Sequence, residues 1–383
     1  MPSNYKRLGD YIKEVNIRNT DLKIDKLIGV SIEKKFISSV ANIVGTDMSV
    51  YKVVKKNQLA CKLMSVGRDE KLPVNLYLSD EPAIISSAYY VFESKNDKVL
   101  LPEYLKMWLF RKETDRYVGY ISGGDVRGGI SWDTFCDMPI IIPSVERQQE
   151  LVNEFNIIQN RITLNNQLIG KLEETTQTIY KQWFVDEIDF ENLPNKWCKG
   201  SLKDICEFSN KRIAINNITL ENYISTENML PDRIGISFAN NLPTTGNVIN
   251  YEIGNILLSN IRPYLKKIWL ANFEGGCSND VLCFVSKSNI SPLYLYQILE
   301  KDNFFDYIMA GSKGTKMPRG DKKWIMNYEI VIPDKEILDK FDKVSQIFQK
   351  DIQLKKKQNQ KLEKFKDLLL AKMTKVESNK EIA

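Results

Sequence analysis

The 383-residue sequence contains no histidine. This absence excludes Ser-His-Asp and Cys-His hydrolases, nucleases that bind metal through histidine, and HEXXH metalloenzymes, because all of these need an imidazole. The sequence also lacks the G-x-x-x-x-G-K-[ST] loop that holds nucleotide phosphates and the G-x-G-x-x-G turn that binds dinucleotides. The Asn-Pro-Pro or Asp-Pro-Pro tetrapeptide used by amino-methyltransferases is missing as well. We therefore expect no catalysis of these kinds.

Long apolar runs and paired cysteines are also missing. No run approaches the ~20 apolar residues that a membrane-spanning helix needs, and the first residues lack the apolar segment of a signal peptide. The six cysteines are scattered without a Cys-x-x-C pair, which argues against a zinc site and suits a reducing compartment. We expect a cytoplasmic protein that binds neither metal nor membrane.

What the sequence does contain is a long internal repeat. Residues 140–184 and 330–374 align without a gap at a constant offset of 190 positions. Both copies open on Ile-x-Ile-Pro and continue as a helical pattern of about forty residues. Identical pairs include Ile142/Ile332, Pro143/Pro333, Ile162/Ile352, Leu164/Leu354 and Lys171/Lys361. A gap-free match over so long a helix indicates duplication.

Each copy of the repeat carries apolar residues at alternating steps of three and four, which form one stripe along a helix that must be buried. In the first copy the stripe is Leu151, Phe155, Ile158, Ile162, Ile169, Leu172, Ile179 and Trp183. In the second it is Phe341, Phe348, Ile352, Leu362, Leu369 and Met373. Both stripes turn polar near the middle. We favour an intramolecular antiparallel coiled coil; the alternative is two unrelated dimerisation helices.

The segments outside the helices predict two mixed α/β domains, so we expect an α+β protein with two pseudo-symmetric halves. Leu8 and Asp10 near the start of the first domain are matched by Leu202 and Asp204 in the second, and a glycine-rich loop precedes each helix, at residues 122–129 and 311–316. The expected boundaries are domain 1 at 1–143, helix 1 at 144–184, an acidic linker at 185–198, domain 2 at 199–333, helix 2 at 334–376 and a tail at 377–383.

Two similar domains joined by antiparallel helices would form a pseudo-twofold arrangement, and duplex DNA has twofold symmetry as well. A helix of forty residues is ~60 Å long at 1.5 Å per residue, which would hold two domains at least one DNA turn apart. Such a protein could read two half-sites at a fixed spacing. Because the two domains share little beyond their scaffold, the half-sites should differ.

The order of these parts resembles the specificity (S) subunit of type I restriction-modification enzymes. The resemblance covers nearly the whole chain and lies in the order and duplication of the motifs. They are Leu8–Asp10 and Leu202–Asp204, Leu193-Pro194 with Trp197, Ile256–Leu265, the two glycine-rich loops, the Ile-x-Ile-Pro helices, Lys171-Leu172-Glu173 and Trp183-Phe184-Val185-Asp186.

The resemblance implies that each domain is a target recognition domain and each long helix a conserved spacer. It further implies a subunit without catalysis of its own, which binds double-stranded DNA. Two modification (M) subunits would carry S-adenosylmethionine and methylate adenine N6. Restriction (R) subunits would hydrolyse ATP, with Mg²⁺, and cut. This chain would bind none of these cofactors, and would work in the cytoplasm of a bacterium or archaeon.

Candidate DNA contacts follow from chemistry, because phosphates attract Lys, Arg and backbone N–H groups, and base edges attract Arg, Asn, Gln and Ser. In domain 2 the candidates are Ser259, Asn260, Arg262, Tyr264, Lys266, Lys267, Lys313, Lys316, Arg319, Lys322 and Lys323. In domain 1 they are Lys62, Arg68, Lys71, Gly124 and Arg127. Domain 1 lacks the Arg-Pro-Tyr sequence of Arg262–Tyr264. Any single cation here could equally be a solubilising charge, except Arg262, which we favour as a contact because Pro263 fixes the geometry of its loop. Tyr264 could stack on a base, but packing is favoured.

Two other functions remain open at this point. One is a coiled-coil scaffold without a role in nucleic-acid binding. The other is a stand-alone nuclease with a carboxylate site that the sequence pattern does not reveal.

Overall fold

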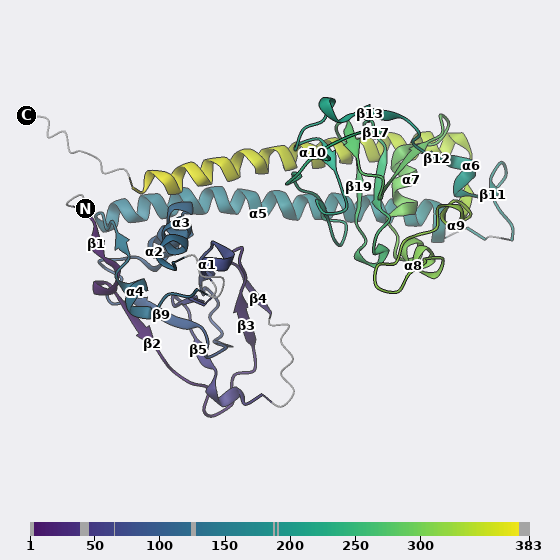
Figure 1. Ribbon diagram of the computed structural model, residues 1–383. Coiled ribbons are helices and arrows are strands. Elements are labelled where there is room, and N and C mark those ends of the chain that lie inside the picture. The colour runs from purple at the N-terminus through teal and green to yellow at the C-terminus, as the bar shows by residue number, and fades with distance from the viewer. Residues whose placement is uncertain are drawn as a thin grey trace, which may run out of the picture. The chain divides into compact units, whose positions relative to one another are not determined.

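The computed structural model describes residues 4–38, 46–64, 66–123, 128–186, 188–189 and 191–374. The chain forms two compact units: unit 1 is Met1–Asn166 with Lys356–Ala383, and unit 2 is Gln167–Lys355. Helices α5 (Val145–Lys181) and α10 (Lys335–Lys372) each contribute one half to each unit (Figure 1). The described part of the chain contains no helix that is both long and apolar enough to cross a membrane.

Unit 1 contains two four-stranded sheets. The first has the order β2 (Ile12–Val15), β9 (Tyr90–Ser94), β6 (Leu59–Cys61) and β7 (Val74–Leu76). The second has the order β4 (Phe36–Ser38), β3 (Leu27–Val30), β8 (Ala83–Ile85) and β5 (Lys52–Val54). Beside them lie the β1 (Lys6–Arg7) and β10 (Pro139–Ile140) pair and helices η1 (Leu8–Asp10), η2 (Met48–Val50), α1 (Val66–Asp69), α2 (Pro102–Phe110), α3 (Lys112–Ile121) and α4 (Trp132–Cys136).

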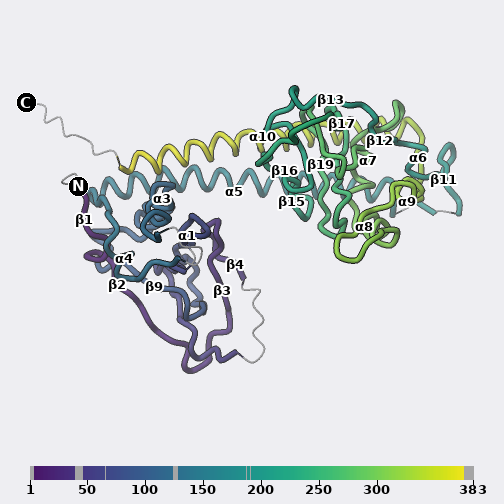
Figure 2. Tube along the Cα trace, viewed as in Figure 1, coloured from purple at the N-terminus to yellow at the C-terminus, as the bar shows by residue number. Residues whose placement is uncertain are grey.

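Unit 2 repeats this plan. One sheet has the order β12 (Cys206–Phe208), β21 (Val281–Ser286), β18 (Ile256–Ser259) and β19 (Ile268–Leu270). The other has the order β13 (Arg212–Ala214), β17 (Asn247–Tyr251), β20 (Gly275–Cys277) and β14 (Tyr223–Ile224). The remaining elements are the pairs β11 (Cys198–Ser201) with β22 (Glu329–Ile332) and β15 (Met229–Leu230) with β16 (Gly235–Ile236), and helices η3 (Gln182–Asp186), α6 (Leu202–Ile205), η4 (Ile215–Asn217), η5 (Pro263–Leu265), α7 (Pro292–Leu299), α8 (Asp302–Ala310) and α9 (Lys322–Met326) (Figure 2).

Matching hydrogen bonds in the two units confirm the pseudo-symmetric fold class. In unit 1 the Tyr104 hydroxyl donates to the Ile141 carbonyl at 2.9 Å. In unit 2 the Tyr294 hydroxyl donates to the Val331 carbonyl at 2.7 Å, with both residues displaced by 190 positions. Helix α2 begins at Pro102 and α7 at Pro292, where a missing N–H costs nothing at the first helical position.

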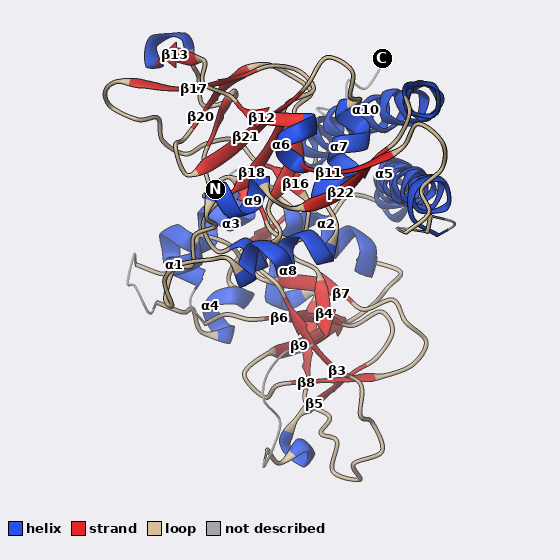
Figure 3. Cartoon of the chain, turned by 90° about the vertical axis from the view of Figure 1, so that its right-hand side faces the viewer, coloured by secondary structure: helices blue, strands red, loops and turns tan. Residues whose placement is uncertain are grey.

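The two long helices lie side by side (Figure 3). They pair antiparallel within each unit, as expected. In unit 1 the amide of Asn165 donates to Asn359 at 2.8 Å, and Lys366 reaches Gln159 at 3.4 Å, so α5 and α10 run in opposite directions. In unit 2 the rings of Tyr180 near the end of α5 and Phe341 near the start of α10 lie 6.1 Å apart. The coiled coil that the apolar stripes predicted is therefore confirmed.

None of the fourteen apolar stripe residues is exposed; each is buried or half-buried. Two aromatic residues outside the stripe are nevertheless buried more deeply than their neighbours Ile179 and Trp183. Tyr180, near the end of α5, and Phe184 both pack into the core of unit 2. Phe184 lies in η3, a π-helical turn that rotates the residues after Lys181 relative to an α-helix.

The long helices also explain why unit 1 combines two separate stretches of the chain. The core of unit 1 includes Leu151 and Phe155 from the start of α5 and Leu369 and Met373 from the end of α10. Each helix half thus packs on its nearest α/β domain. The domain boundaries expected from the sequence, at residues 143, 184, 198, 333 and 376, remain a prediction.

Candidate nucleic-acid interface

In unit 2 the residues after strand β18 meet the second glycine-rich loop. The N–H of Arg262 donates to the Pro318 carbonyl at 2.9 Å, and the N–H of Gly320 donates to the Asn260 carbonyl at 3.3 Å. Backbone bonds between Lys313 and Arg319, at 3.0 Å in both directions, close the loop itself. We call residues 259–267 and 311–323 the unit 2 loop surface, since these bonds make them one continuous structure.

Arg262 holds an unusual backbone conformation at the centre of this surface. Its φ is +51°, in the left-handed region that residues other than glycine seldom adopt, and Pro263 then starts η5. The Arg262 side chain is half-buried, and its Nε has no hydrogen-bond partner among the described residues. A buried donor without a hydrogen bond costs free energy, so a ligand that accepts from this Nε would be favoured.

Asn260, two positions earlier in the chain, also has a buried polar atom without a hydrogen-bond partner among the described residues. Its Oδ1 is buried without a partner among the described residues and lies against Gly320. A Cβ at Gly320 would come within 2.8 Å of that oxygen, so only glycine leaves room for this side chain. Asn260 and Arg262, which follow β18, thus each have a buried side-chain atom that could still form a hydrogen bond.

Several cations of the unit 2 loop surface are oriented by carboxylates. Lys313 lies 2.8 Å from Asp321, and Arg319 lies 3.3 Å from Asp280. The hydrogen bond from Lys313 lowers the pKa of Asp321 to about 2. Lys266 lies 2.6 Å from Asp302 and is directed toward it. These acids hold the cations in defined positions and would share them with an incoming phosphate.

The remaining candidates of unit 2 fall into two groups. Lys316, Lys322, Lys323 and Tyr264 are exposed, and Lys322 lies over the Phe208 ring at 5.6 Å. Ser259 and Lys267 have structural bonds instead. The Ser259 hydroxyl donates to the Ile261 carbonyl at 3.0 Å, and Lys267 donates to the Thr226 carbonyl at 2.7 Å while burial lowers its pKa.

Unit 1 forms the same junction with different side chains. The N–H of Ile130 donates to the Leu63 carbonyl at 3.1 Å, and the N–H of Gly67 donates to the Gly128 carbonyl at 3.1 Å. We call residues 62–64 and 66–71 with 128–130 the unit 1 loop surface. Lys62 is half-buried there, and Arg68 and Lys71 are exposed. Gly124 and Arg127 lie outside the described residues.

Sequence reasoning missed the aromatic support of the unit 2 glycine-rich loop. The rings of Trp324 and Tyr307 stack at 5.0 Å, and the Trp324 indole N–H donates to the Tyr307 carbonyl at 3.0 Å. A Cβ at Gly311 would lie 2.2 Å from the Trp324 ring. The candidate residues chosen from the sequence also did not include Asp280, Asp302 and Asp321, the carboxylates that pair with the cations of this surface. Among the described residues, no group of three or more Cys, Asp or Glu is placed to hold a metal ion.

This chain is similar in sequence to proteins of known families. Residues 194–364 match the family model described as "Type I restriction modification DNA specificity domain". The HindI specificity subunit of Haemophilus influenzae is 28% identical over 163 residues, which are 41% of this chain and 34% of that protein. The MjaIX specificity subunit of Methanocaldococcus jannaschii is 25% identical over 299 residues, 72% of this chain and 68% of that protein.

The alignment therefore spans about a third of the first relative and about two thirds of the second. The fold agrees with a solved structure, the type I restriction-modification S subunit from M. genitalium. That chain superposes with a TM-score of 0.58 at 15% identity, covering 96% of this chain and 95% of that one. Over residues 194–364, less than half of its length, this chain is thus similar to the DNA specificity domain of type I restriction-modification systems, and its fold is similar to that of a solved S subunit.

Proposed function

We propose that this chain reads DNA sequence for a type I restriction-modification complex and has no catalytic activity itself. It would recognise an asymmetric bipartite target on double-stranded DNA, with one half-site for each loop surface. The similarity of residues 194–364 to the type I DNA specificity domain supports this function. The observation that carries the proposal is the same backbone junction in both units with different side chains on it.

The side chains on the two loop surfaces suit sequence reading. Arginine pairs in a bidentate way with guanine, asparagine pairs with adenine, and lysine neutralises phosphates. Unit 2 offers Asn260 and Arg262 at the end of a strand, and the exposed Lys316, Lys322 and Lys323 belong to the other segment of the same loop surface. Unit 1 offers Lys62 and Arg68 at the corresponding place. Different side chains on one scaffold support two different half-sites.

We further propose that two M subunits dock on the long helices, and that R subunits join them. Ile157 and Ile347, related by the repeat, are 70% and 63% exposed, and Leu164 and Leu354 are 57% and 52% exposed. Exposed apolar side chains that recur in this way suit two equivalent partner contacts. S-adenosylmethionine, ATP and Mg²⁺ would belong to these partners. The complex would act in the cytoplasm, where it meets DNA.

The gap between half-sites would depend on the long helices, because α5 and α10 are each uninterrupted over 37 and 38 residues. Removing one helical turn from both helices would shorten each by about 5.4 Å. The expected result is a target with the same half-sites and a shorter gap. An unchanged gap would show that the helices do not set the spacing.

The proposed function is tested by mapping methylated adenines in cells that carry the partner methyltransferase, with and without this chain. We expect N6-methyladenine at one bipartite motif whose halves differ, and none of it without the chain. Purified chain with its methyltransferase should bind that motif tightly, with an affinity that falls steeply as salt rises. Methylation that is independent of this chain, or a single continuous motif, would refute the proposal.

A further inference from the structure

Tyr264 is the one aromatic residue of the unit 2 loop surface, and it is 50% exposed. The packing that the sequence favoured thus leaves half of this residue in water. Among the described residues its hydroxyl has no hydrogen-bond partner and its ring has no aromatic neighbour. Single exposed apolar side chains are common on protein surfaces, so exposure alone does not point to a ligand. What distinguishes Tyr264 is the rigidity of the loop that carries it.

Two residues with left-handed backbones flank the ring. Arg262 has a φ of +51° and Lys266 a φ of +49°, and Pro263 starts η5 between them. The N–H of Leu265 donates to the Arg262 carbonyl at 2.9 Å, and the N–H of Lys266 donates to the Pro263 carbonyl at 2.8 Å. Residues other than glycine keep this conformation only where surrounding contacts maintain it. The neighbours of η5 must therefore hold it in place.

These contacts come from the turn between β15 and β16. The N–H of Asp232 donates to the Leu265 carbonyl at 2.9 Å, and the N–H of Arg233 donates to the Lys266 carbonyl at 3.0 Å. Asp302 accepts hydrogen bonds from the side chains of Lys266, at 2.6 Å, and Arg233. These bonds lower the pKa of Asp302 to about 2, so its carboxylate is ionised at neutral pH. A ring on so rigid a loop loses little conformational entropy when it binds.

The charge around Tyr264 suits a nucleic acid. The unit 2 loop surface is rich in lysine and arginine, which attract phosphates, and Asp321 is its one acid. Stacking of a base on an aromatic ring raises affinity by roughly 5-fold to 150-fold. Methylation of an adenine in duplex DNA requires that the base leave the stack, and a side chain inserted between base steps stabilises such unstacked DNA. A rigid, exposed ring among cations is suited to that insertion.

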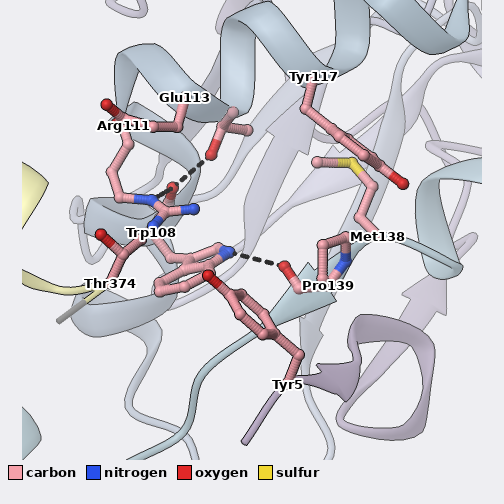
Figure 4. Close-up of a pocket in the computed structure, with 9 residues that line it drawn as sticks. Tyr5, Trp108, Arg111, Glu113, Tyr117, Met138, Pro139 and Thr374 are labelled. Atoms are coloured by element: carbon pink, nitrogen blue, oxygen red, sulfur yellow. Dashed lines mark hydrogen bonds between the residues drawn. The ribbon is translucent and has the colours of Figure 1, made fainter. Parts of the chain in front are cut away.

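Unit 1 has no matching ring on its loop surface. Among the described residues of that surface none is aromatic, and Met64 is its exposed apolar side chain, at 57%. The rings of Tyr5, Trp108 and Tyr117 instead line a pocket that shares no residue with this surface (Figure 4). A contact that depends on a ring would therefore be made in one half-site only.

We propose that the Tyr264 ring inserts between bases beside the adenine that the unit 2 half-site presents for methylation, and so stabilises that adenine outside the base stack. The inference rests on the proposed function, because it requires DNA bound to this chain and its methyltransferase. Tyr264 is a positioning residue here, since it acts through the shape of the DNA and forms no covalent bond. The unpaired hydroxyl assigns the role to the ring.

Methylation of single adenines by the complex of this chain with its methyltransferase tests the insertion. Two duplexes carry the mapped bipartite motif, and each is methylated beforehand at one half-site so that only the other accepts a methyl group. Tyr264→Ala should slow methylation of one adenine by roughly 5-fold to 150-fold, the contribution of one stacked base, and leave the other unchanged. Tyr264→Phe keeps the ring and should restore most of the rate. Phe238→Ala removes a ring of unit 2 that is 69% exposed but lies outside the loop surface, and should change neither rate.

A mismatch opposite the affected adenine distinguishes insertion from an ordinary surface contact. An adenine that is already unpaired costs less to extrude, so Tyr264→Ala should slow its methylation much less than that of the paired adenine. Normal methylation of the other half-site by the same variant shows that it folds and assembles.

The outcomes separate the inference from the function on which it rests. Equal loss on paired and mismatched duplexes would overturn the insertion, because the ring would then contact DNA without replacing a base. An unchanged rate with Tyr264→Ala, equal loss at both half-sites, or equal effects of Tyr264→Ala and Phe238→Ala would overturn it too. If the unchanged complex methylated no bipartite motif, the proposed function would be refuted, and the inference with it.

Discussion

The two loop surfaces have the same backbone junction but hold their arginines in different ways. In unit 1, Arg68 pairs with its neighbour Asp69 at 2.7 Å, in the short helix α1. In unit 2, Arg262 has a left-handed backbone and no side-chain partner among the described residues. Duplication therefore preserved the backbone bonds, which depend little on side chains, and left the side chains free to diverge. That divergence would be the physical basis for the two different half-sites that we propose.

The largest effect is expected where the scaffold of unit 2 has no room for a side chain. Gly320→Ala would bring a Cβ within 2.8 to 2.9 Å of Asn260, Ile308 and Ile325. Overpacking of this kind should cost unit 2 about 1–3 kcal/mol of unfolding free energy and displace Asn260 from the loop surface. Urea unfolding and DNA binding by the assembled complex measure the two effects.

Gly170→Ala provides the matched control. Gly170 lies within α5, and a Cβ there would have nothing within 4 Å. Because alanine favours helix, this change should stabilise the protein by about 0.5–1 kcal/mol. Equal effects of the two substitutions would show that the Asn260–Gly320 contact does not shape the surface.

Arg262→Ala should weaken base discrimination in one half-site only. Loss of a bidentate contact costs about 1–3 kcal/mol, or roughly 5-fold to 150-fold in preference for the correct base. Arg68→Ala is the matched change in unit 1. It should affect the other half-site, and less strongly, because Asp69 already occupies that guanidinium. Competition binding with single-base variants distinguishes the half-sites. A uniform loss across all sequences would identify Arg262 as a phosphate contact.

The units should also differ in their response to pH. Glu300 in unit 2 is buried, and burial raises the pKa of its carboxyl from 4.5 to about 7, whereas unit 1 has Phe110 at the matching position. A raised carboxyl pKa favours folding below pH 4.5, and this contribution is lost as pH rises toward 7. Glu300→Gln should therefore stabilise unit 2 at pH 8 by about 1–3 kcal/mol relative to the unchanged chain.

Urea unfolding of the full chain at pH 5 and pH 8 measures this effect. Glu113 of unit 1, whose side chain is 42% exposed, gives the control substitution Glu113→Gln, which should leave the pH dependence unchanged. If the unchanged chain and Glu300→Gln lost stability equally between the two pH values, another group would be responsible.

The smallest effect concerns the polar middle of the coiled coil. Asn165 is 3% exposed and donates to Asn359, which in turn donates to Asn166. Asn165→Ala leaves the Asn359 oxygen without its donor and should cost unit 1 about 1 kcal/mol. Thr163→Ala, on the exposed face of the same helix, should change stability by less than about 0.5 kcal/mol. Equal effects in urea unfolding would show that this bond contributes nothing.

The long helices were predictable from the sequence because apolar residues at heptad spacing, such as Leu151, Phe155 and Ile162, form one helix face that must be buried. The duplication was predictable because identical residues at a constant offset of 190 positions can be read from the sequence without knowledge of the fold. The junction between β18 and the glycine-rich loop was not, since the bond from Arg262 to Pro318 joins residues 56 positions apart. The carboxylates beside Lys266, Lys313 and Arg319 were missed for the same reason. Phe184 was missed because a π-helical turn breaks the heptad step, and Tyr180 was missed because it lies one position beyond the stripe residue Ile179.

The central claim, that each unit reads its own half-site, is tested most directly by giving the chain two copies of one reader. Residues 1–143 would replace residues 199–333, with both long helices kept, and methylated adenines would be mapped in cells with the partner methyltransferase. The account predicts methylation at an inverted repeat of the unit 1 half-site. An unchanged asymmetric motif, or a motif without the repeated half-site, would contradict it.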